Sequence, residues 1–201
     1  MSLLLELTFM KFTLLVVTAL SFFTFFNDPV YRLGIKGPLS FNKTSLELVW
    51  TDKPNNNYYV QEYIPKDELI EKFNQMLTIH LFTNQVTAEI AVRQKVNWLI
   101  DRKKTDTICN YQISESPDGK EFILDFLVGE SKEGKMTITE FNVYRYKQIM
   151  MDGKSTLLVS AYSKRSYGDS IIPFLKTLNT NRVAYLNEMI TFSLPSIKIS
   201  K

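Results

Sequence analysis

Cysteine and histidine are nearly absent from this chain of 201 residues, which holds one of each, Cys109 and His80. A lone cysteine cannot form an intramolecular disulfide, so the core alone has to stabilise the fold, even in an oxidising compartment. The same scarcity excludes a cysteine-ligated zinc site and any site that needs two histidines. The D-x-D-x-D-G spacing of calcium loops is absent too. We therefore expect no metal and no other cofactor.

An excess of one charge is also missing, since 24 Lys and Arg face 21 Asp and Glu, and the net charge is +3. Nucleic-acid binding usually needs a clustered basic face. The basic run at residues 102–104 is short and stands at the end of a predicted helix, where cations stabilise the helix dipole without a partner. We therefore expect no nucleic-acid partner. The hydrophobic fraction of 45% and the aromatic fraction of 13% indicate a folded core.

One long apolar run is present, FTLLVVTALSFFTFF at residues 12–26, and a single basic residue, Lys11, precedes it. This arrangement is typical of a secretory signal peptide. A start at Met10 gives a conventional opening, and residues 19–21 offer a weak cleavage site. Residues 9–26 are also just long enough to anchor the chain in a membrane if they are not cleaved. A buried hydrophobic helix or strand is the third interpretation.

These alternatives set the expected localisation and domain organisation. We expect the protein to be exported, as a periplasmic or secreted domain, or attached to the membrane by its N-terminus through residues 9–26. No cysteine lies near the run, which excludes a lipoprotein anchor. Residues 1–26 form the signal peptide or anchor, residues 27–44 an irregular lead-in with prolines and glycines, and residues 45–201 a single domain.

The first half of the predicted domain contains two strands and two helices. Residues 45–51 and 58–64 have the alternation and composition of strands. A helix is predicted from about Asp67, because apolar residues recur there at helical spacing. These residues are Leu69, Ile70, Phe73, Met76 and Leu77. A second helix is predicted from residue 86 or 87 to residue 103, although the β-branched residues at 85–92 also permit a strand.

Residues 106–164 have the pattern of a four-stranded antiparallel meander. Turn residues separate the strands, above all Asp152-Gly153, the preferred pair for a tight hairpin. The predicted strands are residues 107–114, 121–128, 136–150 and 155–163. Two further helices are expected at residues 169–178 and 181–194.

This order of elements predicts an α+β fold, in which an antiparallel sheet of about six strands is packed by two or three helices. The order is similar to the Mog1/PsbP-like architecture over residues 45–194. The resemblance rests on element order without a shared motif, so it implies a fold and assigns no functional residue.

Few residues qualify as catalytic candidates. His80 is a capable general base, but it has no identifiable nucleophile as a partner, and a histidine at a helix end is more often a surface or capping residue. Cys109 lies in a predicted strand, where a free cysteine is usually buried packing. A carboxylate pair would need two scattered residues to converge. The carboxylate candidates are Asp52, Glu62, Glu115, Asp125 and Glu140.

Aromatic and basic residues on the two long strands form the candidate ligand-binding patch. Tyrosine rings can stack on a glycan, and the cations can bind anionic groups. Alternation along a strand divides the set between the two faces of the sheet, and tyrosine is common in sheets anyway, so an ordinary sheet face is the alternative. The patch residues are Tyr144, Arg145, Tyr146, Tyr162 and Arg165.

Three functions remain open, because no constellation of residues selects among them. The first is an exported or membrane-anchored, non-catalytic domain that binds a partner protein or a polar ligand. The second is a hydrolase of unrecognised type that uses His80 or a carboxylate pair. The third is an accessory subunit of a membrane complex, whose N-terminal helix packs against other helices.

Overall fold

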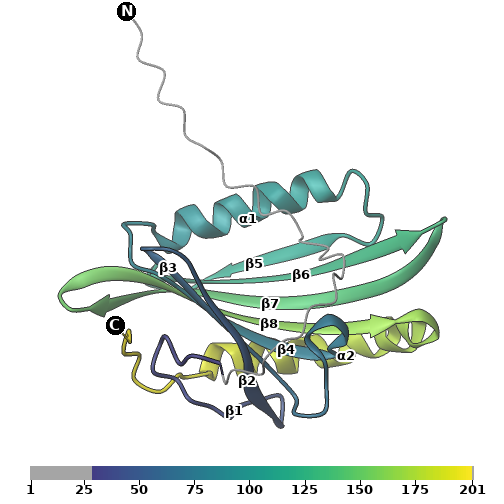
Figure 1. The fold of residues 1–201 in the computed structure, drawn as a ribbon. Helices are drawn as coiled ribbons and strands as arrows, with labels where there is room; N and C mark the ends of the chain where they lie inside the picture. The colour runs from purple at the N-terminus through teal and green to yellow at the C-terminus, as the bar shows by residue number, and fades with distance from the viewer. Residues whose placement is uncertain (1–28, 201) are drawn as a thin grey trace, which may run out of the picture.

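The computed structural model describes residues 29–200, and within them one antiparallel sheet of eight strands forms a half-barrel (Figure 1). The spatial order is β1-β2-β3-β4-β8-β7-β6-β5. In chain order the strands are β1 (Leu39–Phe41), β2 (Thr44–Asn55), β3 (Tyr58–Ile64), β4 (Gln75–Phe82), β5 (Asn110–Glu115), β6 (Glu121–Lys132), β7 (Lys135–Met151) and β8 (Lys154–Tyr167). The predicted signal peptide or anchor at residues 1–26 lies outside the described residues.

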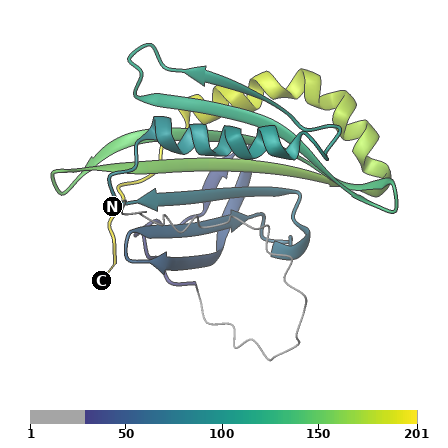
Figure 2. The ribbon, with the colours of Figure 1, turned by 90° about the horizontal axis from the view of Figure 1, so that it is seen from above.

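Two α-helices occur in this part of the chain, α1 (Ala88–Arg102) and α2 (Ile171–Thr191), and they pack on opposite faces of the sheet (Figures 1 and 2). Short 3₁₀ turns lie at Ile70–Lys72 and Gly168–Ser170. The predicted α+β fold with about six strands is therefore wrong: the molecule is mostly antiparallel sheet. The Mog1/PsbP-like order fails with it, because only a short 3₁₀ turn, and no α-helix, separates β3 from β4.

The helix predicted from Asp67 is the main cause of this error: Met76 and Leu77 of its apolar stripe belong to strand β4, and the other three residues of the stripe precede that strand. β4 lies between β3 and β8 in the sheet, with a covered face on each side. Both alternating sets of its side chains are therefore largely buried, and the period of two is hidden in the sequence QMLTIHLF. His80 consequently lies within a central strand, not past the end of a helix.

The C-terminal region forms one helix, α2, where two were predicted. The residues Asn179–Asn181 are poor helix formers and led to the predicted break. Tertiary packing outweighs that preference, because Leu178, Tyr185 and Met189 are all buried against the sheet. Pro173 stands in the first turn, where its missing N–H has no intrahelical acceptor in any case.

Several other local predictions are confirmed, although β2 extends to Asn55 and β5 begins only at Asn110, after Cys109. β3 spans the predicted residues 58–64, and α1 starts after Thr87, whose side chain accepts a 3.2 Å hydrogen bond from the Ile90 N–H. The four-stranded meander is formed by β5 to β8. Asp152 and Gly153 adopt left-handed backbone angles, φ 48° and 73°, as a tight hairpin turn of the primed type requires.

The segment expected as an irregular lead-in, residues 27–44, carries strand β1 and contributes to the core on the α2 face. Leu33 and Ile35 are fully buried. They are held by Gln61, whose side-chain oxygen accepts a 2.7 Å hydrogen bond from the Leu33 N–H. Tyr63 donates a 3.0 Å hydrogen bond to the Ile35 carbonyl and accepts one of 2.7 Å from Gln61.

Candidate functional site

Polar side chains from four strands and one helix gather on the α1 face of the sheet. The strand register makes them neighbours: Glu62 pairs with Thr78, Thr78 with Ala161, and Ala161 with Tyr144. Two rows further along the same face, beyond Ser163 and Asn142, Arg165 pairs with Glu140. Seven residues make up this group, which we call the polar cluster: Tyr58, Glu62, His80, Lys95, Glu140, Tyr144 and Arg165.

Small side chains occupy the centre of the face that carries the polar cluster. Thr78, Ala161 and Ser163 lie at adjacent positions on β4 and β8, and their exposed fractions are 8%, 2% and 8%. Because these side chains are short, the longer side chains of Glu62 and Arg165 at the margins can lie over them. The arrangement therefore combines a small-residue floor with charged and aromatic groups around it.

Arg165 and Glu140 form the ion pair of the polar cluster. The Glu140 carboxylate also accepts a 3.0 Å hydrogen bond from the side-chain amide of Asn142. The oxygen of that amide in turn accepts a 2.6 Å hydrogen bond from the Ser163 hydroxyl. The Arg165 guanidinium lies 4.1 Å from the centre of the Phe73 ring. Both charges are half-buried with several partners, so this pair is held more rigidly than an exposed one.

Glu62 is a second carboxyl group within the electrostatic range of Arg165. Burial raises the pKa of the Glu62 carboxyl to about 7, although the Arg165 guanidinium acts in the opposite direction. Its protonation state therefore changes near neutral pH, while Glu140 is engaged in the ion pair. Two carboxyl groups in such different environments can serve as a proton donor and an anion on the same face.

His80 and Tyr58 are joined by a 2.9 Å hydrogen bond between the imidazole Nδ1 and the phenolic oxygen. Burial lowers the pKa of His80 to about 4, and the positive charge of Lys95 adds to this effect. The histidine is thus neutral at physiological pH. No carboxylate within residues 29–200 makes a hydrogen bond or ion pair with it, so a catalytic triad around His80 is not formed by that part of the chain.

Lys95 projects from α1 into a set of aromatic rings. Its ammonium lies 4.0 Å from the ring centre of Trp98, 4.9 Å from that of Phe126 and 5.4 Å from that of Tyr144. Burial lowers the pKa of Lys95 to about 8, and Glu140 partly opposes this shift. Cation–π contacts of this kind connect α1 to β6 and β7.

The predicted ligand-binding patch is divided between the two faces. Tyr144 and Arg165 belong to the polar cluster, and Tyr146 is buried on the same face, 4% exposed. Arg145 and Tyr162 lie on the α2 face, where Tyr162 is fully buried in the core. The structure therefore brings together only part of the predicted set.

The remaining sequence candidates are dispersed. Cys109 is 2% exposed and packs in the α1 core. Asp125 pairs with Arg182 of α2 at 2.7 Å, and Glu115 is exposed on β5. Lys95 and Tyr58 were missed, although Lys95 interrupts the apolar stripe of α1 between Val92 and Leu99, which is a readable signal.

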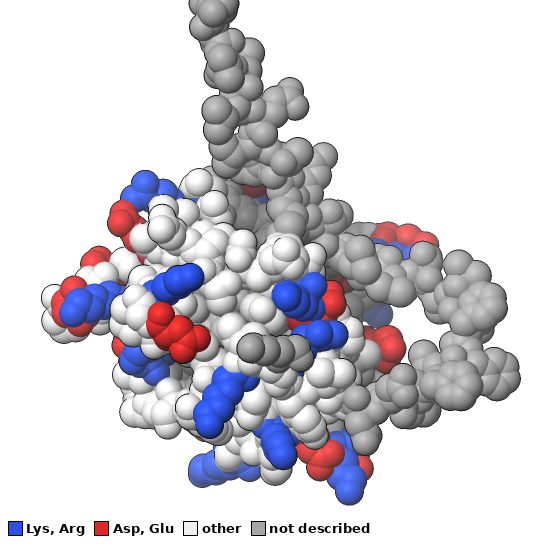
Figure 3. All heavy atoms as spheres, turned by 60° about the vertical axis from the view of Figure 1, so that its left-hand side comes forward, with Lys and Arg blue, Asp and Glu red and all other residues white. Residues whose placement is uncertain are grey.

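Two surface hollows lie outside the polar cluster. One of about 470 Å³ lies between the end of α1 and β5, and one of about 490 Å³ lies beside the β7–β8 hairpin and the segment after α2. Figure 3 shows one face of the molecule, on which basic and acidic side chains are interspersed. Across residues 29–200, no group of three metal-ligating side chains is assembled, and no helix is both long and apolar enough to cross a membrane.

Residues 33–194 match the model of a protein family whose description states no activity, ligand or partner. No curated protein matches the chain. The family match begins inside the segment expected as a lead-in, in agreement with the burial of Leu33 and Ile35. Because the match covers most of the chain, the protein belongs to this family.

Proposed function

We propose that this chain is an exported or membrane-anchored binding domain that holds a polar ligand at the polar cluster. The observation that carries the proposal is the convergence of four titratable groups, Glu62, His80, Lys95 and Arg165, over a floor of small residues. Half-buried charges are costly in a purely structural role, so their concentration on one face favours a site. The absence of a partnered nucleophile within residues 29–200 favours binding over catalysis.

The chemistry of the polar cluster indicates the class of ligand. Tyr144 and Trp98, both half-buried, offer aromatic surface, while Arg165 and Lys95 offer cations and Glu62 a proton donor or acceptor. A glycan or an acidic polar compound would use both kinds of contact. Trp50, 40% exposed on the neighbouring strand and paired with Glu62, would extend the aromatic margin.

Binding can be tested with the full chain and three probes: chitotriose, trigalacturonic acid and the dipeptide Glu-Glu. We expect at least one probe to change the tryptophan fluorescence, since Trp98 contacts Lys95. A double variant, Glu140→Gln with Arg165→Gln, removes both partners of the ion pair and should abolish the response. Its matched control is Glu89→Gln with Arg93→Gln, which removes an exposed pair on α1. If the wild type responds to none of the three probes, the proposed ligand class is rejected.

A hydrolase is the second candidate, because Glu62 and Glu140 both interact with Arg165. A protonated carboxyl beside an ionised one is the arrangement used in glycoside hydrolysis. Chromatography of chitotriose after incubation with the full chain tests this candidate. Cleavage that stops in both Glu62→Gln and Glu140→Gln would support it, and cleavage that continues in either variant would reject it.

Export or anchoring rests on residues 1–26, which the structure does not describe. Mass spectrometry of the mature N-terminus in soluble and membrane fractions of the native host tests it. A soluble product that starts near Phe22 or Asn27 supports an exported domain. An intact N-terminus in the membrane fraction supports an anchor, and with it the accessory-subunit alternative.

A further inference from the structure

The described sheet has two edge strands, and they differ in how they are protected. On one side, β1 has three residues and covers β2 only as far as Leu46; the uncovered part of β2 contains Lys53, Pro54 and two register shifts, features that discourage pairing with another chain. β5 has six residues, NYQISE, and contains neither proline nor lysine. Five of its six residues are exposed. β5 is therefore the edge at which this sheet can accept a further strand.

The adjoining part of β6 is closed, which confines the open edge to β5. β5 pairs only with residues 122–127 of β6. Just beyond that region, Asp106 accepts a 2.7 Å hydrogen bond from the Gly129 N–H, and Arg102 donates one of 2.6 Å to the Gly129 carbonyl. The side chains of Arg102, at the end of α1, and Asp106 thus replace a strand at Gly129, whereas within residues 29–200 no side chain makes a hydrogen bond to the backbone of β5.

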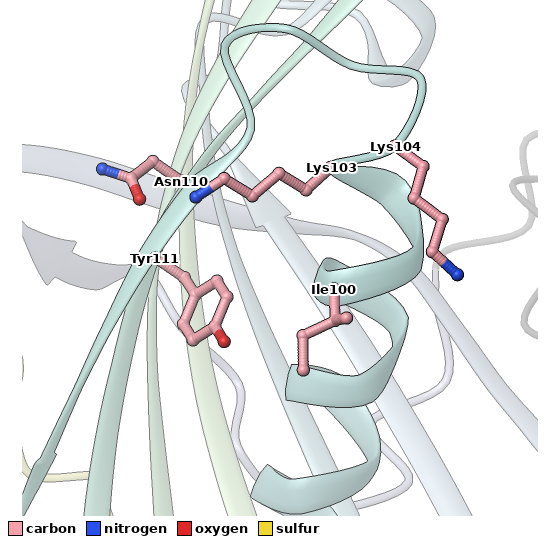
Figure 4. Close-up of a pocket in the computed structure, with 5 residues that line it drawn as sticks. All are labelled: Ile100, Lys103, Lys104, Asn110 and Tyr111. Atoms are coloured by element: carbon pink, nitrogen blue, oxygen red, sulfur yellow. The ribbon is translucent and has the colours of Figure 1, made fainter.

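A hollow of about 470 Å³ adjoins this edge. Its lining residues are Ile100, Lys103, Lys104, Asn110 and Tyr111. In Figure 4 the Lys103 side chain runs from the end of α1 toward Asn110 on β5, Ile100 and Tyr111 lie on opposite sides of the gap, and Lys104 points away. The lining holds two ammonium groups and no carboxylate.

Lys103 is the cation available to a partner. Lys104 is paired with Asp101 at 2.7 Å, whereas no carboxylate among residues 29–200 lies within ion-pair distance of Lys103. Ile100 on α1 and Ile113 on β5 are 47% and 42% exposed, and both offer apolar contacts to a partner. A strand that pairs with β5 would present every second side chain to this surface.

We propose that β5 and the adjoining hollow bind an extended acidic segment of a partner protein, which adds to the sheet as a ninth strand. Main-chain hydrogen bonds to β5 provide the affinity. A carboxylate of the segment pairs with Lys103, and an apolar side chain two residues away lies between Ile100 and Tyr111. This interaction is independent of the polar cluster, so either proposal can fail without the other.

The probe is a fluorescein-labelled peptide, Val-Thr-Glu-Thr-Val-Thr-Glu, titrated with the full chain in a polarisation assay. We expect saturable binding that weakens by about tenfold or more when both glutamates are replaced by lysine. N-methylation of alternate amides should weaken it by about tenfold as well, because it removes strand hydrogen bonds without changing the side chains. Lys103→Glu should weaken it at least about fivefold, while the control Lys132→Glu, an exposed residue at the β6–β7 turn, leaves it unchanged.

Three results would overturn the proposal. They are an absence of saturable binding, an affinity that N-methylation does not change, and an affinity that Lys103→Glu does not change. Light scattering on the free protein provides a fourth check. A stable dimer that Ile113→Lys dissociates, combined with no peptide binding, would assign the β5 edge to a second copy of the chain.

Discussion

The guanidinium of Arg145 donates a 2.9 Å hydrogen bond to the carbonyl oxygen of Phe192, the C-cap residue of helix α2. It also donates to the Met189 carbonyl at 3.3 Å and pairs with Glu121 of β6. A cation placed at the last carbonyls of a helix compensates their unpaired acceptors and the negative end of the helix dipole. Arg145, predicted as a ligand-binding residue, therefore holds the end of α2 against the sheet.

Replacing Arg145 with methionine should destabilise the protein by ~1–3 kcal/mol, because Glu121 loses a partner and two carbonyls lose a donor. Equilibrium urea unfolding followed by circular dichroism measures this loss. Arg93→Met is the control, since the Arg93 side chain is 69% exposed and forms an exposed ion pair with Glu89, so the loss of stability should stay below ~0.5 kcal/mol. Equal losses in the two variants would contradict the capping role.

Gly129→Ala should destabilise the protein by ~1–3 kcal/mol through steric overlap. A Cβ at Gly129 would lie 2.9 Å from Cδ1 and 3.0 Å from Cγ1 of Ile108. Ile108→Val removes the Cδ1 atom, so the double variant should recover part of the stability that Gly129→Ala loses. Thermal denaturation of the two single variants and the double variant tests this coupling. Strictly additive effects would show that the overlap is not the cause.

Gln61→Met should cost ~1–3 kcal/mol, because it leaves the buried Leu33 N–H without its acceptor. Tyr63→Phe should cost less, about 1 kcal/mol, since it removes only the hydroxyl that donates to Ile35 and accepts from Gln61. Amide hydrogen exchange at Leu33 gives a second measurement, and it should accelerate strongly in Gln61→Met. Unchanged exchange there would mean that the lead-in is held by other contacts.

Glu62 should make the stability of the protein decrease with rising pH. Its pKa is raised by burial from 4.5 to about 7, so the folded state binds a proton more tightly than the unfolded state. The resulting stabilisation is fully present below about pH 4.5 and is lost as the pH rises through about 7. We expect the unfolding free energy of the wild type to fall by ~1–3 kcal/mol relative to Glu62→Gln across this window.

The comparison with Glu62→Gln separates this effect from that of His80. The lowered pKa of His80, about 4, acts in the opposite direction, because the unfolded state then binds the proton more tightly. His80 is present in both proteins, so its contribution largely cancels in the difference. Parallel stability curves for wild type and Glu62→Gln would contradict the raised pKa of Glu62.

The candidate site was predictable only in part. Alternation along β7 and β8 correctly implied that the aromatic and basic set divides between the two faces of the sheet. It placed Tyr144 and Arg165 on the same face. Their companions Tyr58, Glu62 and Lys95 come from β3 and α1, which are distant in the chain. Which elements meet is decided by the order of strands in the sheet, and a single sequence carries no direct signal of that order.

Local interactions specified the parts of this protein that sequence patterns predicted correctly. The bounds of β3, the hairpin turn at Asp152-Gly153 and the start of α1 at Thr87 depend on neighbouring residues, whose backbone preferences and capping bonds act within a few positions. Tertiary structure decided the rest. β4 is a strand and α2 a single helix because burial against distant elements stabilises them by more than their local preferences oppose. The same packing determines which face each tyrosine and arginine occupies, and therefore which of them can meet a ligand.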